Sequence, residues 1–560
     1  MMGWLPVALL AVPLLGASLL LISPGSLRPV LRVYGLAFSG LTLALAVMLA
    51  ATFDYAQAAR PQFTVDQPWI PGLDLRFHLG VDGISLPLVV LTALLTFLCF
   101  AYLSWGDARG PGQLRASATG RPRALVFTLL VLEVGMIGTF LALDLLLFFV
   151  FFEIVLIPMY FLIAIWGGRG RRGAAIKFIL YTLLGSVVML LGLLLIWSQT
   201  GTLDIVALGQ AHGAGMSRAV QILAFAAVGI GLAVKTPMWP LHTWLPDAHT
   251  EAPTVGSVLL AGVLLKMGTY GFARIAIPVL PEGAVAIAPW LGALAVVGIV
   301  YGSLACLAQR DLKRMIAYSS VGHMGFVLLG FATLTTVGIN GALFANVAHG
   351  LITGLLFFLA GAIKERYGTA DMPSLGGGML ATLPHLGAVL TFAAIASLGI
   401  PGLAGFWGEM LSLLGAFQPA EALPRGLFLV FMVIGGLGAV LTAAYFLVML
   451  SRVTHGLPAR TVPSLVATHP GPAEEPPASA AGLGPDGPGA GAEAAGERPE
   501  ASETEPFVPE ATIEGMRDIR GYELVAWVPL IVLILVFGLW PKLLLSLTTP
   551  AVQTLLGALS

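Results

Sequence analysis

Ionisable side chains in the middle of strongly apolar segments are the residues of this 560-residue sequence that could carry out chemistry. Six of them stand out, each in a different segment: Glu153, Lys235, Lys266, His323, His349 and Glu409. A charge at the centre of a bilayer costs about 2.5–3.5 kcal/mol on insertion scales. A static ion pair that holds two helices together is the alternative for any single residue, but such a pair needs only two charges. A dispersed row of groups that accept and release protons, with water between them, is what a proton path requires.

Glu153 and Lys235 are the pair that could gate such a path. Burial favours the neutral form of each group, whereas mutual approach favours the charged forms. A pair that is alternately drawn together and separated would therefore take up and release protons. Glu133, in LLVLEVGMI, is a further acidic residue at depth. It is either a second acidic site or a hydrogen-bonded structural residue, and we prefer the second interpretation.

Helix-breaking residues lie close to the charges in two of the apolar segments, 219–245 and 385–415. Pro237 stands just after the charge in VKTPMWPLHTW, and Pro401 stands before it in SLGIPGLAGFWGEM. Proline removes a backbone donor and clashes with the preceding turn of a helix. Non-helical backbone survives at membrane depth only where it is buried in protein or lines a polar cavity. We therefore expect two interrupted helices, each beside a buried charge.

The elements that position these residues must be membrane-spanning helices. The chain is 58% hydrophobic and only 10% charged, whereas a soluble domain carries about 25% charged residues. A bilayer core requires about 20 apolar residues per helix, which predicts an all-α integral membrane protein with about fourteen spans. The predicted spans are residues 4–24, 29–51, 82–104, 124–143, 145–166, 176–198, 219–239, 252–276, 286–308, 313–334, 340–363, 385–415, 428–451 and 524–548.

Interrupted helices at corresponding points of two halves indicate an inverted repeat. With five spans in each repeat, the second would have the opposite orientation in the membrane. The predicted division of the chain is N-terminal spans at 1–123, a first repeat at 124–276, a second repeat at 286–452, a linker at 456–523 and a last span within 524–560.

The loops predict which side of the membrane each end faces. Most Lys and Arg residues lie in loops that follow odd-numbered spans, and cytoplasmic loops carry this excess. Both termini are therefore expected on the outer side and the 456–523 linker on the cytoplasmic side. That linker is rich in Pro, Gly, Ala and Glu without apolar periodicity, which predicts disorder. The first apolar run has no basic region before it and is expected to be a span rather than a cleavable signal.

Redox and metal chemistry find little support in the sequence. The two cysteines, Cys99 and Cys306, form no C-x-x-C pattern, and there is no dinucleotide-binding fingerprint or histidine pair suited to haem. In WLPDAHTEAPT, His249 lies beside Asp247 and Glu251, but the spacing fits no standard metal-ligand set. We expect Thr250 or Glu251 to cap the helix that follows.

Four stretches carry a resemblance to a known family: LALDLLLFFVFFEIVLIPMYFLI, VKTPMWPLHTWLPDAHTEAPTVGSVLLAGVLLKMGTYG, DLKRMIAYSSVGHMGF and GIPGLAGFWGE. The chain resembles the antiporter-like subunits of respiratory complex I, and is most similar to the subunit M (chain 4) family of bacterial NADH–quinone oxidoreductase. The resemblance covers nearly all the chain except the first two spans and residues 456–523. A glutamate at position 409, where the related subunit L has a lysine, favours subunit M.

The resemblance implies a proton-translocating module in the membrane arm of a redox enzyme. By similarity, Glu153 and Lys235 would be the charge pair of the inward half-channel and Lys266 the connecting lysine. His323 and His349 would belong to the central hydrophilic axis. The outward terminal residue would be the glutamate at 409, whereas the glutamate at 133 has no counterpart role. The resemblance also implies a bacterial inner membrane, neighbouring antiporter-like subunits L and N, and FMN, Fe–S clusters, NADH and quinone bound in other subunits.

Two other functions remain open at this point. Subunits of multisubunit Na⁺/H⁺ antiporters share the same core, and the sequence separates them poorly from a complex I subunit. A purely structural membrane scaffold is the third reading, and it predicts that neutralising Lys235 leaves transport intact.

Overall fold

The computed structural model describes residues 3–22, 31–105, 121–456 and 518–557. Within these ranges, thirteen helical segments are long and apolar enough to cross a membrane. They are α1 (Trp4–Ile22), α2 (Leu31–Thr52), α3 (Ser85–Trp105), α4 (Pro122–Leu141), α5 with α6 (Leu145–Ile154 and Leu156–Trp166), α7 (Arg171–Thr200), α9 (Arg218–Lys235), the run of α11, η5, α12, η6 and α13 (Thr254–Leu259, Leu260–Leu264, Leu265–Gly271, Phe272–Ala276 and Ile277–Val279), α14 (Pro281–Leu307), α15 (Leu312–Ala332), α16 (Thr336–Tyr367), α21 (Arg425–Val453) and α22 (Gly521–Leu539).

Shorter elements connect or extend these spans. They are η2 (Tyr55–Gln57), β1 (Gln62–Ile70), η3 (Pro71–Leu73), β2 (Leu75–Val81), α8 (Ile205–Ala211), α10 (Trp244–Glu251), α17 (Met372–Leu375), α18 (Met379–Thr382), α19 (Pro384–Ser397), α20 (Ala404–Phe417) and α23 (Lys542–Leu555). The predicted all-α class is confirmed for the spans. One element was not expected, an antiparallel hairpin of β1 and β2 that lies outside them.

The predicted twelfth span, 385–415, is divided between two helices, which is why the described part of the chain has one long span fewer than predicted. α19 ends at Ser397 and α20 begins at Ala404, so neither is long enough to cross a membrane alone. The turn between them contains Gly399 and Gly402, both with positive φ angles, a backbone conformation that glycine adopts without steric penalty. α9 is interrupted in a similar way, because it ends at Lys235 and helical structure resumes only at α10.

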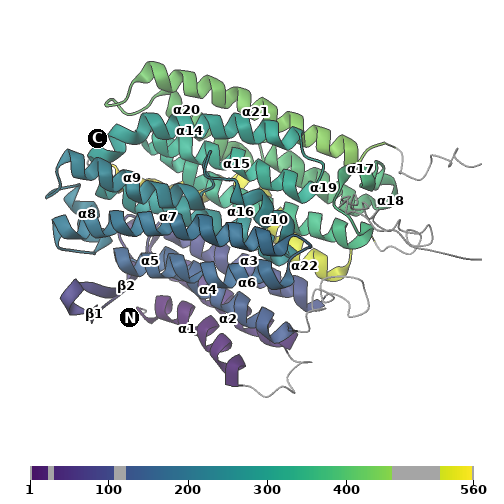
Figure 1. Ribbon diagram of the computed structural model, residues 1–560, viewed down its shortest axis with the longest axis horizontal. Helices are drawn as coiled ribbons and strands as arrows, with labels where there is room; N and C mark the ends of the chain where they lie inside the picture. Colours follow the sequence, from purple (N-terminus) through teal and green to yellow (C-terminus); the bar gives the residue numbers. More distant parts are fainter. Residues whose placement is uncertain (1–2, 23–30, 106–120, 457–517, 558–560) are drawn as a thin grey trace, which may run out of the picture.

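The helices run side by side between two opposite ends of the molecule (Figure 1). At the left of the view lie the β1–β2 hairpin, α8 and both marked chain ends; we call this end the hairpin face. At the right lie α17, α18, the end of α21 and the start of α22; we call this end the linker face. Residues 457–517 lie outside the described residues, so their predicted disorder stays a prediction.

A small backbone motif occurs twice, with the same spacing in the chain. Asp144 pairs with Asp204 in an isolated antiparallel bridge, and Asp311 pairs with Asp371 in another. All four aspartates cap the helices that follow them, α5, α8, α15 and α17. Each bridge has two reciprocal backbone hydrogen bonds of 2.8–2.9 Å: Leu145 N to Leu203 O and Ile205 N to Leu143 O, then Leu312 N to Ala370 O and Met372 N to Arg310 O. α8 marks the hairpin face and α17 the linker face, so the two copies lie at opposite ends of the molecule.

The first copy also fixes the hairpin to the helices. His78 of β2 lies with its Nδ1 3.2 Å from a carboxylate oxygen of Asp204. Burial alone would raise the pKa of Asp204. The close contact with His78 and hydrogen bonds from the backbone N–H groups of Ala207 and Val206 outweigh burial, so this pKa lies below its ordinary value. The carboxylate therefore stays ionised and keeps both the α8 cap and the contact to the hairpin.

A buried ion pair attaches the last span to the core at the linker face. Arg366, near the end of α16, donates from Nη1 and Nη2 to the two carboxylate oxygens of Glu523 at 2.8 and 2.7 Å. The side chains are 3% and 0% exposed. Bidentate pairs of this kind combine strength with a fixed geometry, so this pair sets where α22 begins.

We expect Arg366→Ala to lower the free energy of unfolding by about 3–5 kcal/mol, because it leaves Glu523 as an uncompensated buried charge. Thermal unfolding of the purified assembly and protease sensitivity at residues 518–523 would measure this loss. The double variant Arg366→Met with Glu523→Leu removes both charges and should recover most of the stability. Equal loss in the single and double variants would contradict the explanation.

Candidate functional site

Lys235 is the last residue of α9, at the point where the helix is interrupted. The backbone N–H of Thr236 still bonds the carbonyl of Leu232, but Pro237 has no N–H with which to continue the ladder. The lysine side chain is 2% exposed. Its Nζ lies 3.4 Å from the carbonyl oxygen of Phe152 and 4.4 Å from the centroid of the Phe152 ring. The ammonium is therefore held by a cation–π contact and one weak hydrogen bond.

Glu153 follows Phe152 in the last turn of α5. The carboxylate influences Lys235 electrostatically, but the two side chains are not among the ion pairs of the described residues. Glu153 Oε1 is buried without a hydrogen-bond partner in the described part of the chain. The predicted gating pair is thus close but open in this structure, with each group free to take a different partner.

Lys266 is fully buried at the start of α12. α12 directly follows η5, a π-helical turn. Such wide turns are frequent at functional sites because they displace backbone carbonyls from the regular ladder. Lys266 Nζ lies 2.6 Å from the carbonyl oxygen of Ala261 and 2.6 Å from Nδ1 of His349 on α16. The contact between Thr269 Oγ1 and Asn346 Oδ1, at 3.0 Å, holds the same two helices together one turn away. Lys266 and His349 therefore share a hydrogen bond through which one proton can pass.

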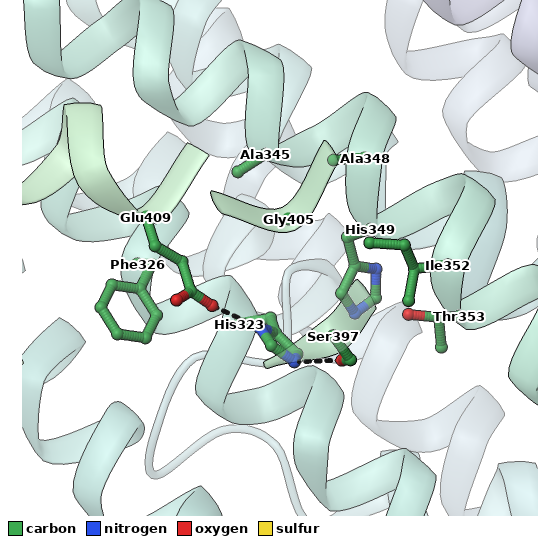
Figure 2. A pocket seen from close by; sticks show the side chains of 10 residues that line it. All are labelled: His323, Phe326, Ala345, Ala348, His349, Ile352, Thr353, Ser397, Gly405 and Glu409. Carbon is green, nitrogen blue, oxygen red and sulfur yellow. Dashed lines mark hydrogen bonds and ion pairs between the residues drawn. The ribbon is translucent and has the colours of Figure 1, made fainter. Parts of the chain in front are cut away.

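His323 on α15 and Glu409 on α20 form the next part of the site (Figure 2). The distance from His323 Nδ1 to Glu409 Oε1 is 3.2 Å, and the distance from Nε2 to Ser397 Oγ is 2.9 Å. The rings of His323 and His349 are in a T-shaped contact, with centroids 5.6 Å apart and an interplanar angle of 64°. Figure 2 shows both rings and the Glu409 carboxylate around one small cavity.

This cavity is large enough for about one water molecule. Its volume is about 20 Å³, and a water needs at least about 10–15 Å³ on this measure together with polar partners. The partners present are His323, His349, Thr353, Ser397 and Glu409. One water here could accept a hydrogen bond from one imidazole and donate to the other, which would link two rings whose centroids lie 5.6 Å apart.

The backbone between α19 and α20 passes close to the Glu409 carboxylate at Gly399. A Cβ atom added to Gly399 would lie 2.8 Å from Glu409 Oε2, closer than non-bonded contacts allow. Gly399 also has a φ of +72°, which costs other residues about 1–2 kcal/mol. The backbone conformation favours glycine here, and a side chain at this position would push the Glu409 carboxylate aside.

We expect Gly399→Ala to displace the Glu409 carboxylate from His323 and to lower proton transport several-fold, if the site transports protons. Gly402→Ala is the matched control. Its φ is +94°, so the backbone strain is similar, but the nearest atom to its Cβ would be Leu539 Cδ2 at 3.9 Å. Ion flux measured in membrane vesicles should therefore fall in the first variant and much less in the second. Equal losses would show that only backbone strain matters.

The structure brings four of the six predicted residues into one sequence of contacts: Lys266, His349, His323 and Glu409. Glu153 and Lys235 form a second group. Glu133 is fully buried, and neither carboxylate oxygen has a hydrogen-bond partner among the described residues. The preferred interpretation of Glu133 as a hydrogen-bonded residue was therefore wrong.

The capping prediction for the WLPDAHTEAPT loop was also wrong. Pro253 precedes α11 without any side-chain cap. Thr250 Oγ1 bonds the carbonyl of Pro246 at 2.7 Å, and Glu251 Oε2 accepts the backbone N–H of Gly170 at 2.9 Å. Glu251 instead ties α10 to the start of α7, because the loop turns its side chain away from the next helix. Among the described residues no group of three or more His, Cys, Asp or Glu side chains is arranged to hold a metal ion.

Sequence reasoning placed His249 in a loop and did not single out Arg274, and the structure shows that both residues are buried. His249, in α10, is fully buried and stacks on Phe357 with centroids 4.5 Å apart; both ring nitrogens lack partners in the described residues. Arg274 in η6 forms a buried ion pair with Asp82. A charge inside GFARIAIPVL is visible in the sequence, but its position near the end of a span made it look like an ordinary boundary residue.

Comparisons with known proteins agree with this architecture. Residues 142–442 match the family model described as "NADH:quinone oxidoreductase/Mrp antiporter, TM". The chain is 43% identical over 425 residues to the NADH-quinone oxidoreductase subunit M of Rhodobacter capsulatus, covering 74% of this chain and 78% of that protein. Among solved structures, a chain of respiratory complex I from Thermus thermophilus with bound NADH is 27% identical with a TM-score of 0.78, covering 99% of this chain and 100% of that one. A chain of the Mrp complex from Dietzia sp. DQ12-45-1b is 22% identical with a TM-score of 0.74, covering 100% and 99%; it shares the fold.

Proposed function

The chain belongs to the subunit M (chain 4) family, the antiporter-like membrane-arm subunits of respiratory complex I, and from this premise we propose that Glu153, Lys235, Lys266, His323, His349 and Glu409 move protons across the membrane. The chain is a subunit of NADH–quinone oxidoreductase, and we propose that it holds no redox centre of its own. FMN, Fe–S clusters, NADH and quinone would then be bound by other subunits. Electron transfer there would supply the energy used here.

One observation carries this proposal: four titratable side chains from four helices form a connected series inside the membrane. Lys266 of α12 touches His349 of α16, and His323 of α15 touches Glu409 of α20. The single gap, between the two imidazoles, adjoins a cavity the size of one water. Keeping this many titratable groups away from water is costly. Their contact in series is what proton transfer needs and what a structural scaffold does not.

The geometry supports a stepwise transfer along the series. Lys266 gives a proton to Nδ1 of His349 through the 2.6 Å hydrogen bond. Because each imidazole has two nitrogens, a proton received on one can be released from the other. Water in the small cavity carries the proton to His323, which passes it to Glu409. Moving one charge against the membrane potential takes about 2.3 kcal/mol per 100 mV, so the series must be driven rather than passive.

Glu153 and Lys235 would act as the gate at the inward end. In the open arrangement, the ammonium rests on Phe152 and the carboxylate has a free buried oxygen. Closing the pair would stabilise both charges, and reopening it would favour release of a proton from Lys235. The pair would thereby control the charge that Lys266 experiences.

The repeated aspartate bridges support two inverted repeats, at about 124–276 and 286–452. Their hydrogen bonds match pair by pair, yet one copy lies on the hairpin face and the other on the linker face. Each repeat also has one interrupted helix beside a proposed proton-carrying residue, Lys235 in the first and Glu409 in the second. The remaining proposed units are 1–123, 456–523 and 524–560.

The membership in the subunit M family also bears on how the chain is oriented in the membrane and which subunits lie beside it. The chain is a multi-pass membrane protein of the complex I membrane arm. We propose that it lies in a bacterial plasma membrane with the hairpin face and both termini outside and the linker face in the cytoplasm. Neighbouring antiporter-like subunits L and N would be its partners.

A Na⁺/H⁺ antiporter subunit is the alternative, since the Mrp complex shares the fold. The test is NADH-driven acidification of membrane vesicles that contain the intact complex, in buffers with and without Na⁺. We expect acidification without Na⁺, and Glu409→Gln should lower it about tenfold, because the last proton acceptor becomes neutral. Glu282→Gln, at an exposed residue of α14, is the control and should have no effect. Strict dependence on Na⁺ would favour the antiporter instead.

A further inference from the structure

A cavity separate from the proton-carrying residues opens at the hairpin face. Its volume is about 320 Å³, and it lies between the turn before β1, α8, the end of the α11–α13 span and the end of α23. Its polar lining consists of five side chains that can all donate hydrogen bonds: Arg60, Gln210, His212, Arg274 and Thr554. The Thr554 hydroxyl already donates to the carbonyl oxygen of Pro550. None of these residues has a role in the proposed proton series.

Arg274 is the buried member of this group. Only 6% of the residue is exposed, and one of its five N–H donors bonds the Asp82 carboxylate. The other Asp82 oxygen accepts the backbone N–H groups of Ile84 and Ser85 and so caps α3. Arg274 Nε has no acceptor anywhere in the described residues. Leaving guanidinium donors buried and unpaired is costly, which indicates that an acceptor is missing from the protein side of the cavity.

His212 supplies a second unpaired atom beside the same space. Its Nδ1 is buried and has no hydrogen-bond partner in the part of the chain that the structure describes. The residue ends α8 in a left-handed conformation, with a φ of 48°. This backbone conformation turns the chain so that Gln210, His212 and Arg274 line one cavity.

We propose that this cavity binds the phosphate group of an anionic phospholipid. The lining contains two cations, Arg60 and Arg274, and no carboxylate among the described residues, while Asp82 and Asp204 act on Arg274 from outside the lining. A guanidinium matches phosphate oxygens with two parallel hydrogen bonds. The apolar lining of Ile205 and Pro278 offers contact to the glycerol and the first methylene groups. Free inorganic phosphate has the same oxygen acceptors, but it would leave this apolar lining unused.

The test uses the intact complex reconstituted in nanodiscs of phosphatidylcholine with an equal amount of phosphatidylglycerol. After washing in detergent, the phosphatidylglycerol that remains bound is counted by mass spectrometry. We expect Arg60→Gln to lower retention about tenfold, the value of one charge-assisted hydrogen bond. Arg274→Gln alone would leave Asp82 uncompensated, so the double variant Arg274→Gln with Asp82→Asn is used beside it and should show the same loss. Arg218→Gln changes an exposed arginine at the start of α9, outside the cavity, and should retain the lipid like the unmodified protein.

The outcomes separate the two sources of phosphate. Stabilisation of the complex by inorganic phosphate in thermal unfolding, lost in Arg60→Gln without any specific lipid retention, would assign the site to a soluble anion and overturn the lipid assignment. Equal lipid retention in all variants, with no effect of inorganic phosphate, would overturn the anion site altogether. Proton transport is not part of this readout, so failure here leaves the proposed function untouched.

Discussion

Lys235→Ala should lower NADH-driven proton transport by about tenfold or more and should lower the coupled quinone reductase activity with it. Lys235 is 2% exposed at the interruption of α9, and it holds the only positive charge that the described structure places on the Phe152 ring. Without the Lys235 ammonium, Glu153 has no opposite charge with which to form an ion pair. The proposed gate then cannot alternate between a closed and an open arrangement. Fluorescence quenching of a pH-sensitive dye in inverted vesicles measures the transport, and quinone-dependent NADH oxidation measures the coupled reaction.

Two controls make this result specific to the buried charge. Lys542→Ala makes the same chemical change at an exposed residue of α23 and should leave both activities unchanged. The amount of assembled complex, measured on native gels, should be similar in all variants, because the Lys235 side chain makes only one weak hydrogen bond. Full transport in an assembled Lys235→Ala complex would support the scaffold reading and defeat the proton-pump assignment.

Lys266→Met should have an effect of similar size, about tenfold or more on transport, for a different reason. Methionine keeps the length and apolar stem of lysine, but it cannot donate the 2.6 Å hydrogen bond to His349 Nδ1. His349 Nε2 has no partner among the described residues, so this variant removes the one hydrogen bond that the structure gives the ring. Proton transfer would then be interrupted between position 266 and His349, while His323 and Glu409 keep their contact.

A comparison of three variants tests whether proton transfer from Lys266 to His349 is the step that is lost. Lys364→Met changes an exposed lysine on α16 and should behave like the unmodified protein. Lys266→Arg restores a positive charge without restoring easy proton release, since guanidinium stays protonated, and should remain defective. If Lys266→Arg instead regained full transport, the residue would act as a fixed charge, and the transfer step through it would have to be abandoned.

The sequence alone determined that this chain spans a membrane many times and which residues are functional candidates. Those predictions rest on quantities that each residue carries locally: the cost of placing a charge among apolar neighbours, and the missing N–H and fixed φ of proline. Lys266 in VLLAGVLLKMGTYGF is conspicuous whatever surrounds it in space. The helix interruptions after Lys235 and before Glu409 could be predicted because Pro237 and Pro401 break a helix through their own local geometry.

Only the tertiary structure decided which candidates touch. Lys266 and His349 are 83 residues apart, and His323 and Glu409 are 86 apart. Their contacts depend on how each helix is rotated and shifted against its neighbours. A helix that is apolar all round gives no periodic pattern from which that rotation could be read. The structure therefore left the Glu153–Lys235 pair open, turned Glu251 toward Gly170 and set Arg274 beside a cavity, because packing of whole helices, rather than any local preference, fixes those positions.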